Sequence, residues 1–138
     1  MSGETATIWK APSAEDPILS EIVRRLVSVY RPERVYLFGS TARGEAGPDS
    51  DYDLLILVPD NVPVERRDSE RGYAAMEGLP RSGDFLIWTV THFESRIHLR
   101  ASLPATVLRE GKLLYAAIAA IAGLLPPEAR SEGALLPF

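Results

Sequence analysis

The segment DYDLLILV, residues 51–58, restricts the fold of this chain more than any other segment. Side chains alternate between the two faces of a strand, so its apolar residues divide into two rows. Those rows are Leu55 and Leu57 on one face, and Leu54, Ile56 and Val58 on the other. A strand that is apolar on both faces is typical of the covered centre of a sheet. The segment therefore predicts a layered fold in which this strand is central.

The segments on either side predict a small mixed sheet flanked by helices, in the α/β (α+β) class. The predicted strands cover 35–38, 51–59, 84–90 and a short edge strand at 113–115. The predicted helices cover 16–30, a single turn at 41–43, 62–79, a helix that opens at 91–94, and 104–110.

Capping residues support several of these boundaries. Asp16 would cap the first helix, with Pro17 at its first position, and Gly111 would close the last one. Thr91 and Glu94 have the spacing of a capping box. In the helix over 62–79, the residues expected to pack inward are Tyr73, Met76 and Leu79.

The composition fits one compact domain, because 138 residues with 46% hydrophobic and 25% charged side chains can bury a sizeable core. We expect a flexible N-terminus at 1–15, the folded domain at 16–115, and a C-terminal helix and tail at 116–138. The Ala/Ile-rich start of that last segment would suit either a partner-binding helix or a self-association helix, and in the second case the protein would be a homo-oligomer.

Charge and residue usage exclude several classes of protein. A formal net charge of -4 argues against binding a long nucleic acid, which needs a dense Lys/Arg surface. The absence of cysteine excludes disulfides, zinc–thiolate sites and thiol nucleophiles. The sequence has no apolar run of membrane-spanning length and no secretory-signal pattern, so we expect a cytoplasmic protein without membrane contact.

Two aspartates lie one residue apart at the start of the central strand. Asp51 and Asp53 would project to the same face, where their charges would repel unless a cation bound between them. Oxygen-only ligands suit a hard cation such as Mg²⁺. The alternative is that Asp49 and Asp51 only shape the turn before the strand.

A Gly-Ser pair ends the preceding strand. Gly39 would let a ligand approach the backbone, and Ser40 would add a hydroxyl beside the N–H groups of a short helix start, which is a phosphate-binding arrangement. Arg43 would add a positive charge. Gly and Ser are also common in ordinary tight turns, so the prediction depends on the nearby aspartates.

The full pattern is Gly39-Ser40, ten further residues, and Asp51-x-Asp53, with Ala42-Arg43-Gly44 inside the gap. It resembles the minimal nucleotidyltransferases of the DNA polymerase β superfamily. The chain is most similar to short prokaryotic members, including the antitoxins of HEPN/minimal nucleotidyltransferase toxin–antitoxin systems. The resemblance implies a polymerase β-like nucleotidyltransferase core over about residues 18–115.

The resemblance also implies a third catalytic carboxylate on a later strand beside the D-x-D strand, and Asp84 fits by position. Asp68, Glu77 and Glu94 compete for this role, although the first two would lie in a helix and the third looks like a capping residue. The alternative for Asp84 is that it only ends the turn at Ser82-Gly83.

The residues implied for the site are Asp51, Asp53 and Asp84, which would hold two Mg²⁺ ions, and Gly39, Ser40 and Arg43, which would hold the β and γ phosphates of ATP or another nucleoside triphosphate. An acceptor hydroxyl would attack the α-phosphorus and release pyrophosphate, with Asp84 accepting the proton. The product would be acceptor–O–NMP.

Three functional classes stay open at this point. The first is a nucleotidyltransferase, most simply transferring AMP, that modifies a partner protein such as a HEPN-type toxin. The second is a nucleotidyltransferase that modifies a small hydroxylated molecule such as an antibiotic. The third is a non-catalytic protein that inhibits its partner by contact, which the complete set of carboxylates disfavours.

Overall fold

The computed structural model describes residues 16–45 and 51–117, so the predicted N-terminal segment and C-terminal tail lie outside the described residues. Its elements are α2 (Pro17–Tyr30), β1 (Arg34–Phe38), α3 (Gly39–Ala42), β2 (Tyr52–Val58), the 3-10 turn η2 (Val64–Arg66), α4 (Glu70–Ala75), β3 (Gly83–Thr89), α5 (Val90–Glu94), α6 (Leu103–Glu110) and β4 (Lys112–Ala116). No helix in this described part is both long and apolar enough to cross a membrane.

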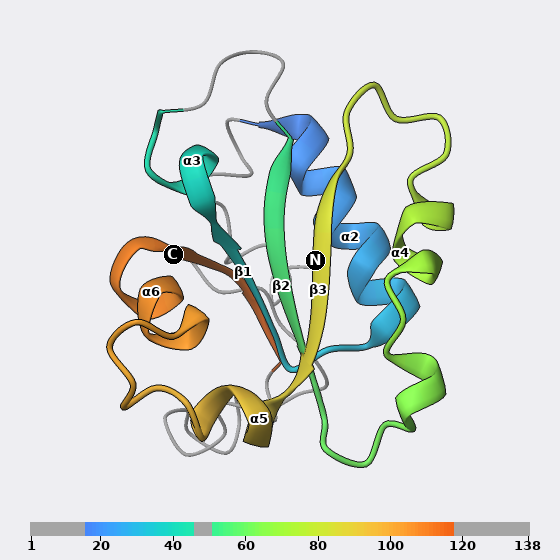
Figure 1. Ribbon diagram of the computed structural model, residues 1–138. Coiled ribbons are helices and arrows are strands. Elements are labelled where there is room, and N and C mark those ends of the chain that lie inside the picture. Colours follow the sequence, from blue (N-terminus) through green and yellow to red (C-terminus); the bar gives the residue numbers. More distant parts are fainter. Residues whose placement is uncertain (1–15, 46–50, 118–138) are drawn as a thin grey trace, which may run out of the picture.

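The strands form one mixed sheet in the order β3-β2-β1-β4 (Figure 1). β2 pairs in parallel with β3 and antiparallel with β1, and β1 pairs antiparallel with β4. β2 is therefore an interior strand, as its two apolar rows predict. β4 is an edge strand, which confirms that prediction as well.

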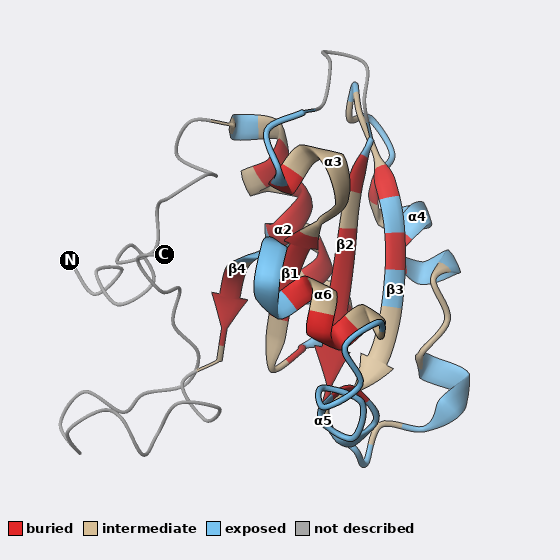
Figure 2. Cartoon of the chain, turned by 60° about the vertical axis from the view of Figure 1, so that its left-hand side comes forward, coloured by how far each residue is buried: buried red, intermediate tan, exposed pale blue. Residues whose placement is uncertain are grey.

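Each face of the sheet is covered by helices (Figures 1 and 2). On one face α2 packs against the β2 row Leu54, Ile56 and Val58, in a cluster that extends to α4 and β3. On the other face Leu55 and Leu57 pack with residues of β1, α5 and α6. All five of these β2 side chains are completely buried, which confirms the prediction of a strand covered on both sides.

Helix α2 begins and ends close to the predicted positions. The Asp16 carboxylate accepts a hydrogen bond from the Leu19 backbone N–H at 3.1 Å, and Pro17 occupies the first turn. The helix stops at Arg31, which is left-handed with φ of 47° and donates its N–H to the Val27 carbonyl. The following Pro32 cannot continue a helix.

The prediction of one helix over 62–79 is wrong, because this segment holds only η2 and α4. Asp68 accepts from the Arg71 backbone N–H, a local bond that competes with a continuous helix. Gly72 donates its N–H to the Tyr30 hydroxyl and packs against Phe85, so contacts with α2 and β3 fix where α4 lies. Tyr73 is 43% exposed instead of packing inward, while Met76 is buried as expected.

The predicted capping box at Thr91 and Glu94 is also wrong. Helix α5 is capped two residues earlier by Thr89, whose hydroxyl oxygen accepts from the His92 backbone N–H. Thr91 instead donates both its hydroxyl and its backbone N–H to Asp60. Glu94 forms an ion pair with Arg34, so tertiary partners override the local pattern.

In the C-terminal part of the domain, one predicted helix is confirmed and the predicted start of the next helix is wrong. Helix α6 ends at the predicted Gly111, whose N–H bonds to the Val107 carbonyl. Ala116, predicted to begin a helix, is the last residue of β4 and pairs with Arg34. The remainder of the predicted C-terminal helix lies outside the described residues.

Candidate functional site

Three chain segments that carry predicted site residues meet at one end of the sheet. Phe38, the last residue of β1, pairs with Asp53 near the start of β2. Asp53 pairs in turn with Asp84 near the start of β3. Since β2 and β3 are parallel, their starts lie at the same end, where α3 also begins (Figure 1).

Gly39 gives the Asp53 carboxylate its space. A Cβ built on Gly39 would lie 2.3 Å from Asp53 Oδ2, far inside van der Waals contact. Gly39 also has φ of +76°, a conformation that L side chains rarely adopt. Two independent constraints therefore favour glycine here, and the first places the end of β1 directly against Asp53.

The carboxylates at this end of the sheet form one electrostatic group. Burial, followed by the charges of Asp84 and Asp51, raises the pKa of Asp53 above its usual value, and Arg43 opposes this shift. Asp53 is partly buried, whereas Asp51 and Asp84 are exposed. Repulsion of this kind is what a bound cation relieves.

The donor chemistry of these residues fits a hard divalent cation, because every candidate ligand is a carboxylate oxygen. No three or more His, Cys, Asp or Glu side chains among residues 16–45 and 51–117 are already arranged to hold a metal ion. The metal-binding role of Asp51, Asp53 and Asp84 therefore stays a prediction.

The predicted phosphate-binding residues lie on and just after the short helix α3. Ser40 is half-buried there, and Thr41 donates its hydroxyl to the Asp51 carbonyl at 3.2 Å, which ties α3 to the segment entering β2. Arg43 forms ion pairs with Glu45 at 3.0 Å and Glu110 at 3.5 Å. A phosphate would compete with these two carboxylates for the Arg43 guanidinium. Phosphate binding by Gly39, Ser40 and Arg43 stays a prediction.

The residues that compete with Asp84 for the third carboxylate lie elsewhere. Asp68 forms an ion pair with Arg71, next to α4. Glu77 follows α4, where its carbonyl accepts from Arg25 of α2. Glu94 lies in α5, at the opposite end of β3 from Asp84. Of the four candidates, Asp84 alone is in register with Asp53 in the described sheet.

Sequence reasoning overlooked the residue between the two aspartates. Tyr52 projects to the face of β2 opposite Asp53, where its ring is completely buried and its hydroxyl forms two hydrogen bonds. It donates to Asp16 Oδ2 at 2.5 Å and accepts from Arg81 Nη1 at 2.9 Å. Burial and the bond to Asp16 raise the pKa of Tyr52 to about 12, so it stays protonated. The sequence did contain a signal for these bonds, because the hydroxyl of a tyrosine on a buried strand needs a hydrogen-bond partner.

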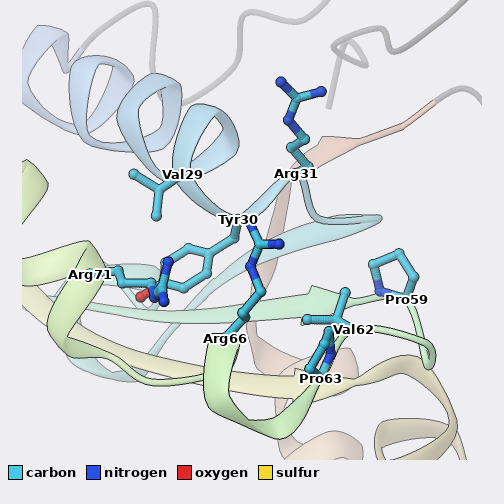
Figure 3. Close-up of a pocket in the computed structure, with 8 residues that line it drawn as sticks. All are labelled: Val29, Tyr30, Arg31, Pro59, Val62, Pro63, Arg66 and Arg71. Atoms are coloured by element: carbon cyan, nitrogen blue, oxygen red, sulfur yellow. The ribbon is translucent and has the colours of Figure 1, made fainter.

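A cavity of about 250 Å³ lies at the other end of α2 (Figure 3). Its walls include Tyr30, Pro59, Arg66 and Arg71, and none of the predicted site residues lines it. Since Pro59 follows the last residue of β2, this cavity and the aspartates lie at opposite ends of that strand.

Comparison with known proteins assigns the family. A family model described as a nucleotidyltransferase domain matches residues 17–114, most of the chain. No curated protein matches. A candidate nucleotidyltransferase from Sulfolobus solfataricus has 22% identity and a TM-score of 0.49, covering 72% of this chain and 78% of its own. A toxin-antitoxin structure with AMP-PNP has 24% identity and a TM-score of 0.44, covering 67% and 69%. These two likenesses are weak, and the family assignment rests on the family model.

Proposed function

This chain belongs to the nucleotidyltransferase domain family. We propose that it transfers a nucleoside monophosphate, with AMP as the expected group, from a nucleoside triphosphate to a hydroxyl of a partner protein. The observation that carries this proposal is the register at one end of the sheet. Asp53 faces Asp84 on the parallel neighbour, and its carboxylate rests against Gly39 at the end of the antiparallel neighbour.

The residues of the proposed site divide into metal ligands and phosphate-binding groups. Asp51, Asp53 and Asp84 hold Mg²⁺ through their carboxylate oxygens. When bound, Mg²⁺ lowers the pKa of an acceptor hydroxyl and neutralises charge on the departing pyrophosphate. Gly39 and Ser40 bind the triphosphate through the backbone and a hydroxyl. Arg43 exchanges its carboxylate partners for phosphate oxygens.

The reaction balances without a further reactant. The acceptor oxygen forms a bond to the α-phosphorus, and the bond from that phosphorus to the oxygen of the β-phosphate breaks. Asp84, the more exposed of the facing pair, accepts the hydroxyl proton. The products are acceptor–O–AMP and pyrophosphate.

The acceptor in this proposal is a protein, and a HEPN-type toxin is the partner that the sequence resemblance favours. The net charge of -4 disfavours a long nucleic acid as acceptor. The described residues hold one sheet with its helices and no second substrate-binding unit. A partner protein would bring its own hydroxyl to the exposed edge near Asp84.

The test uses ATP labelled at the α-phosphate, Mg²⁺ and a HEPN-type toxin as the candidate acceptor. We expect label on that protein, pyrophosphate release, and no transfer from γ-labelled ATP. Label on a small hydroxylated molecule instead would indicate the second functional class. Inhibition of the toxin without any label would contradict catalysis and support inhibition by contact.

A further inference from the structure

We propose that Tyr52, Asp16 and Arg81 act as a positioning unit that holds the starts of β2 and β3 at the spacing nucleotide transfer requires. This inference rests on the proposed function. The three residues touch neither the substrate nor the metal in this proposal. They act through the strands that carry Asp53 and Asp84.

The unit begins at Tyr52, which lies between the two aspartates of the D-x-D pair. Its completely buried ring fixes the side chain, and its hydroxyl joins an Asp16 carboxylate to an Arg81 guanidinium. Both partners are charged, and charge-assisted hydrogen bonds are stronger and shorter than neutral ones. The start of β2 is therefore attached to two other segments through one atom.

Asp16 attaches this atom to helix α2. Its Oδ1 caps the helix by accepting from the Leu19 N–H at 3.1 Å, while its Oδ2 accepts from the Tyr52 hydroxyl. One carboxylate thus serves as helix cap and as strand anchor. The helix it caps is the longest in the described part of the chain and packs across the sheet, so the anchor is rigid.

Arg81 attaches the same atom to the segment entering β3. Its guanidinium stacks over the Tyr52 ring at 4.3 Å and donates to the hydroxyl. Close by, the Tyr52 N–H bonds to the Ser82 carbonyl at 3.3 Å. A Cβ on Gly83 would lie 2.2 Å from the Tyr52 carbonyl oxygen, so the two backbones touch here. Asp84 is the next residue.

Like charges on Asp53 and Asp84 push the two strand starts apart. The positioning unit lies on the opposite face of β2 and resists this separation without occupying the site. A displacement of about 1 Å at reacting groups lowers rates about a hundredfold, so small movements of these strand starts matter.

A purely structural role is the competing explanation, and the chain supplies a matched control. Tyr30 is also buried, donates its hydroxyl to the Asp68 carbonyl at 2.6 Å, and accepts from the Gly72 N–H at 2.8 Å. It lies at the far end of α2, beside the cavity in Figure 3. Tyr30→Phe and Tyr52→Phe remove equivalent groups, but only the second lies beside the aspartates.

The experiment measures kcat, KM for ATP, the Mg²⁺ concentration for half-maximal rate, and thermal stability. We expect Tyr52→Phe to lower kcat by about ten- to a hundredfold and to raise the Mg²⁺ requirement. Tyr30→Phe should lose similar thermal stability with kcat within about twofold of wild type. Asp16→Ser keeps a helix cap but loses the anchor, so it should resemble Tyr52→Phe. The variant that combines Tyr52→Phe with Asp16→Ser should be no slower than the slower of the two single variants, because both changes break the same hydrogen bond.

Amide hydrogen exchange gives a second readout that does not depend on catalysis. Tyr52→Phe should speed exchange at the starts of β2 and β3 more than in their centres, and Tyr30→Phe should not. Equal kcat losses in the two tyrosine variants, or exchange spread evenly over the sheet, would overturn the positioning unit. If the wild type transfers no nucleotide, the proposed function fails, and the exchange pattern alone decides this inference.

Discussion

The two ends of β2 each carry an aspartate, and the fold treats these carboxylates in opposite ways. Near the start of the strand, burial and the charges of Asp84 and Asp51 raise the pKa of Asp53. Just after its end, hydrogen bonds from the Thr91 hydroxyl and backbone N–H lower the pKa of Asp60. Asp60 is thus stabilised as an anion, and Asp53 is not.

This difference separates a structural carboxylate from a candidate catalytic one. Asp60 fixes the first turn of α5 to the loop after β2, so its charge contributes to folding. Asp53 is held near two like charges, which opposes folding, and such arrangements are typical of functional sites. Pairs of variants at the two ends of the sheet can therefore test the proposed function against the fold.

The largest expected effect is the loss of nucleotide transfer in Asp53→Asn, for which Asp60→Asn is the matched control. We expect the first variant to lower the rate by about a thousandfold or more, because metal-held charge provides most of the transition-state stabilisation. Asp60→Asn should stay within a fewfold of wild type. The measurement is release of pyrophosphate, and equal losses in both variants would remove the distinction between the two ends.

Asp84→Ala and Glu94→Ala test the third carboxylate at the two ends of β3. We expect Asp84→Ala to lower the transfer rate by about a hundredfold or more, since it removes the proposed third metal ligand and proposed proton acceptor. Glu94→Ala should affect only an exposed ion pair with Arg34. Near-normal turnover by Asp84→Ala would assign the third carboxylate elsewhere and leave the reaction class intact.

Gly39→Ala and Gly44→Ala separate backbone strain from displacement of Asp53. Both glycines have φ of +76°, so backbone strain should cost each alanine variant about 1–2 kcal/mol in the free energy of unfolding, and the clash with Asp53 should add to this cost in Gly39→Ala alone. Among the described residues, a Cβ on Gly44 meets no atom within 4 Å, whereas one on Gly39 meets the Asp53 carboxylate. Only Gly39→Ala should lower the transfer rate, by about tenfold or more. Denaturant unfolding and initial rates measure the two effects.

The smallest effect is on the pH dependence of stability without divalent ions. The folded-state pKa of Asp53 is raised, so its stabilising contribution is present below its unfolded pKa and lost as pH rises through the folded value. Asp53→Asn should therefore raise the melting temperature near pH 7, and the gain should vanish below about pH 4, where the wild-type carboxyl is protonated in both states.

For Asp60 we expect the opposite pH dependence of stability. Its pKa is lowered, so its contribution is present above the unfolded pKa and lost as pH falls through the folded value. Asp60→Asn should lower the melting temperature near pH 7. A melting temperature that moves in the same direction for both variants would show that the two carboxylates do not differ.

Sequence patterns predicted the parts of this fold that depend on nearby residues. The two apolar rows of β2 predicted its central place, and Asp16 with Pro17 predicted the start of α2. The pairing of Asp84 with Asp53 agrees with the position that the family resemblance implies. The catalytic and binding roles of these residues stay predictions.

The errors occurred where distant residues decide the local structure. The helix over 62–79 is interrupted where the Tyr30 hydroxyl bonds both the Asp68 carbonyl and the Gly72 N–H, which would bond each other in a continuous helix. The capping box at Thr91 fails because Asp60 binds Thr91 first. The hydrogen bond from Tyr52 to Asp16 likewise joins two segments that are distant in the sequence, and no helix or strand periodicity predicts it. In each case a hydrogen bond between residues distant in the sequence decides the local structure.

Parallel pairing of β2 and β3 also determines when during folding this site can form. The chain leaves β2 at one end of the sheet and must return along its whole length before β3 begins. The hairpin-like pairing of β1 with β2 can form early, but Asp84 reaches Asp53 only after that crossover is complete. A nascent chain on the ribosome would therefore present Gly39 and Asp53 well before the third carboxylate, and would gain transfer activity only as its fold closes.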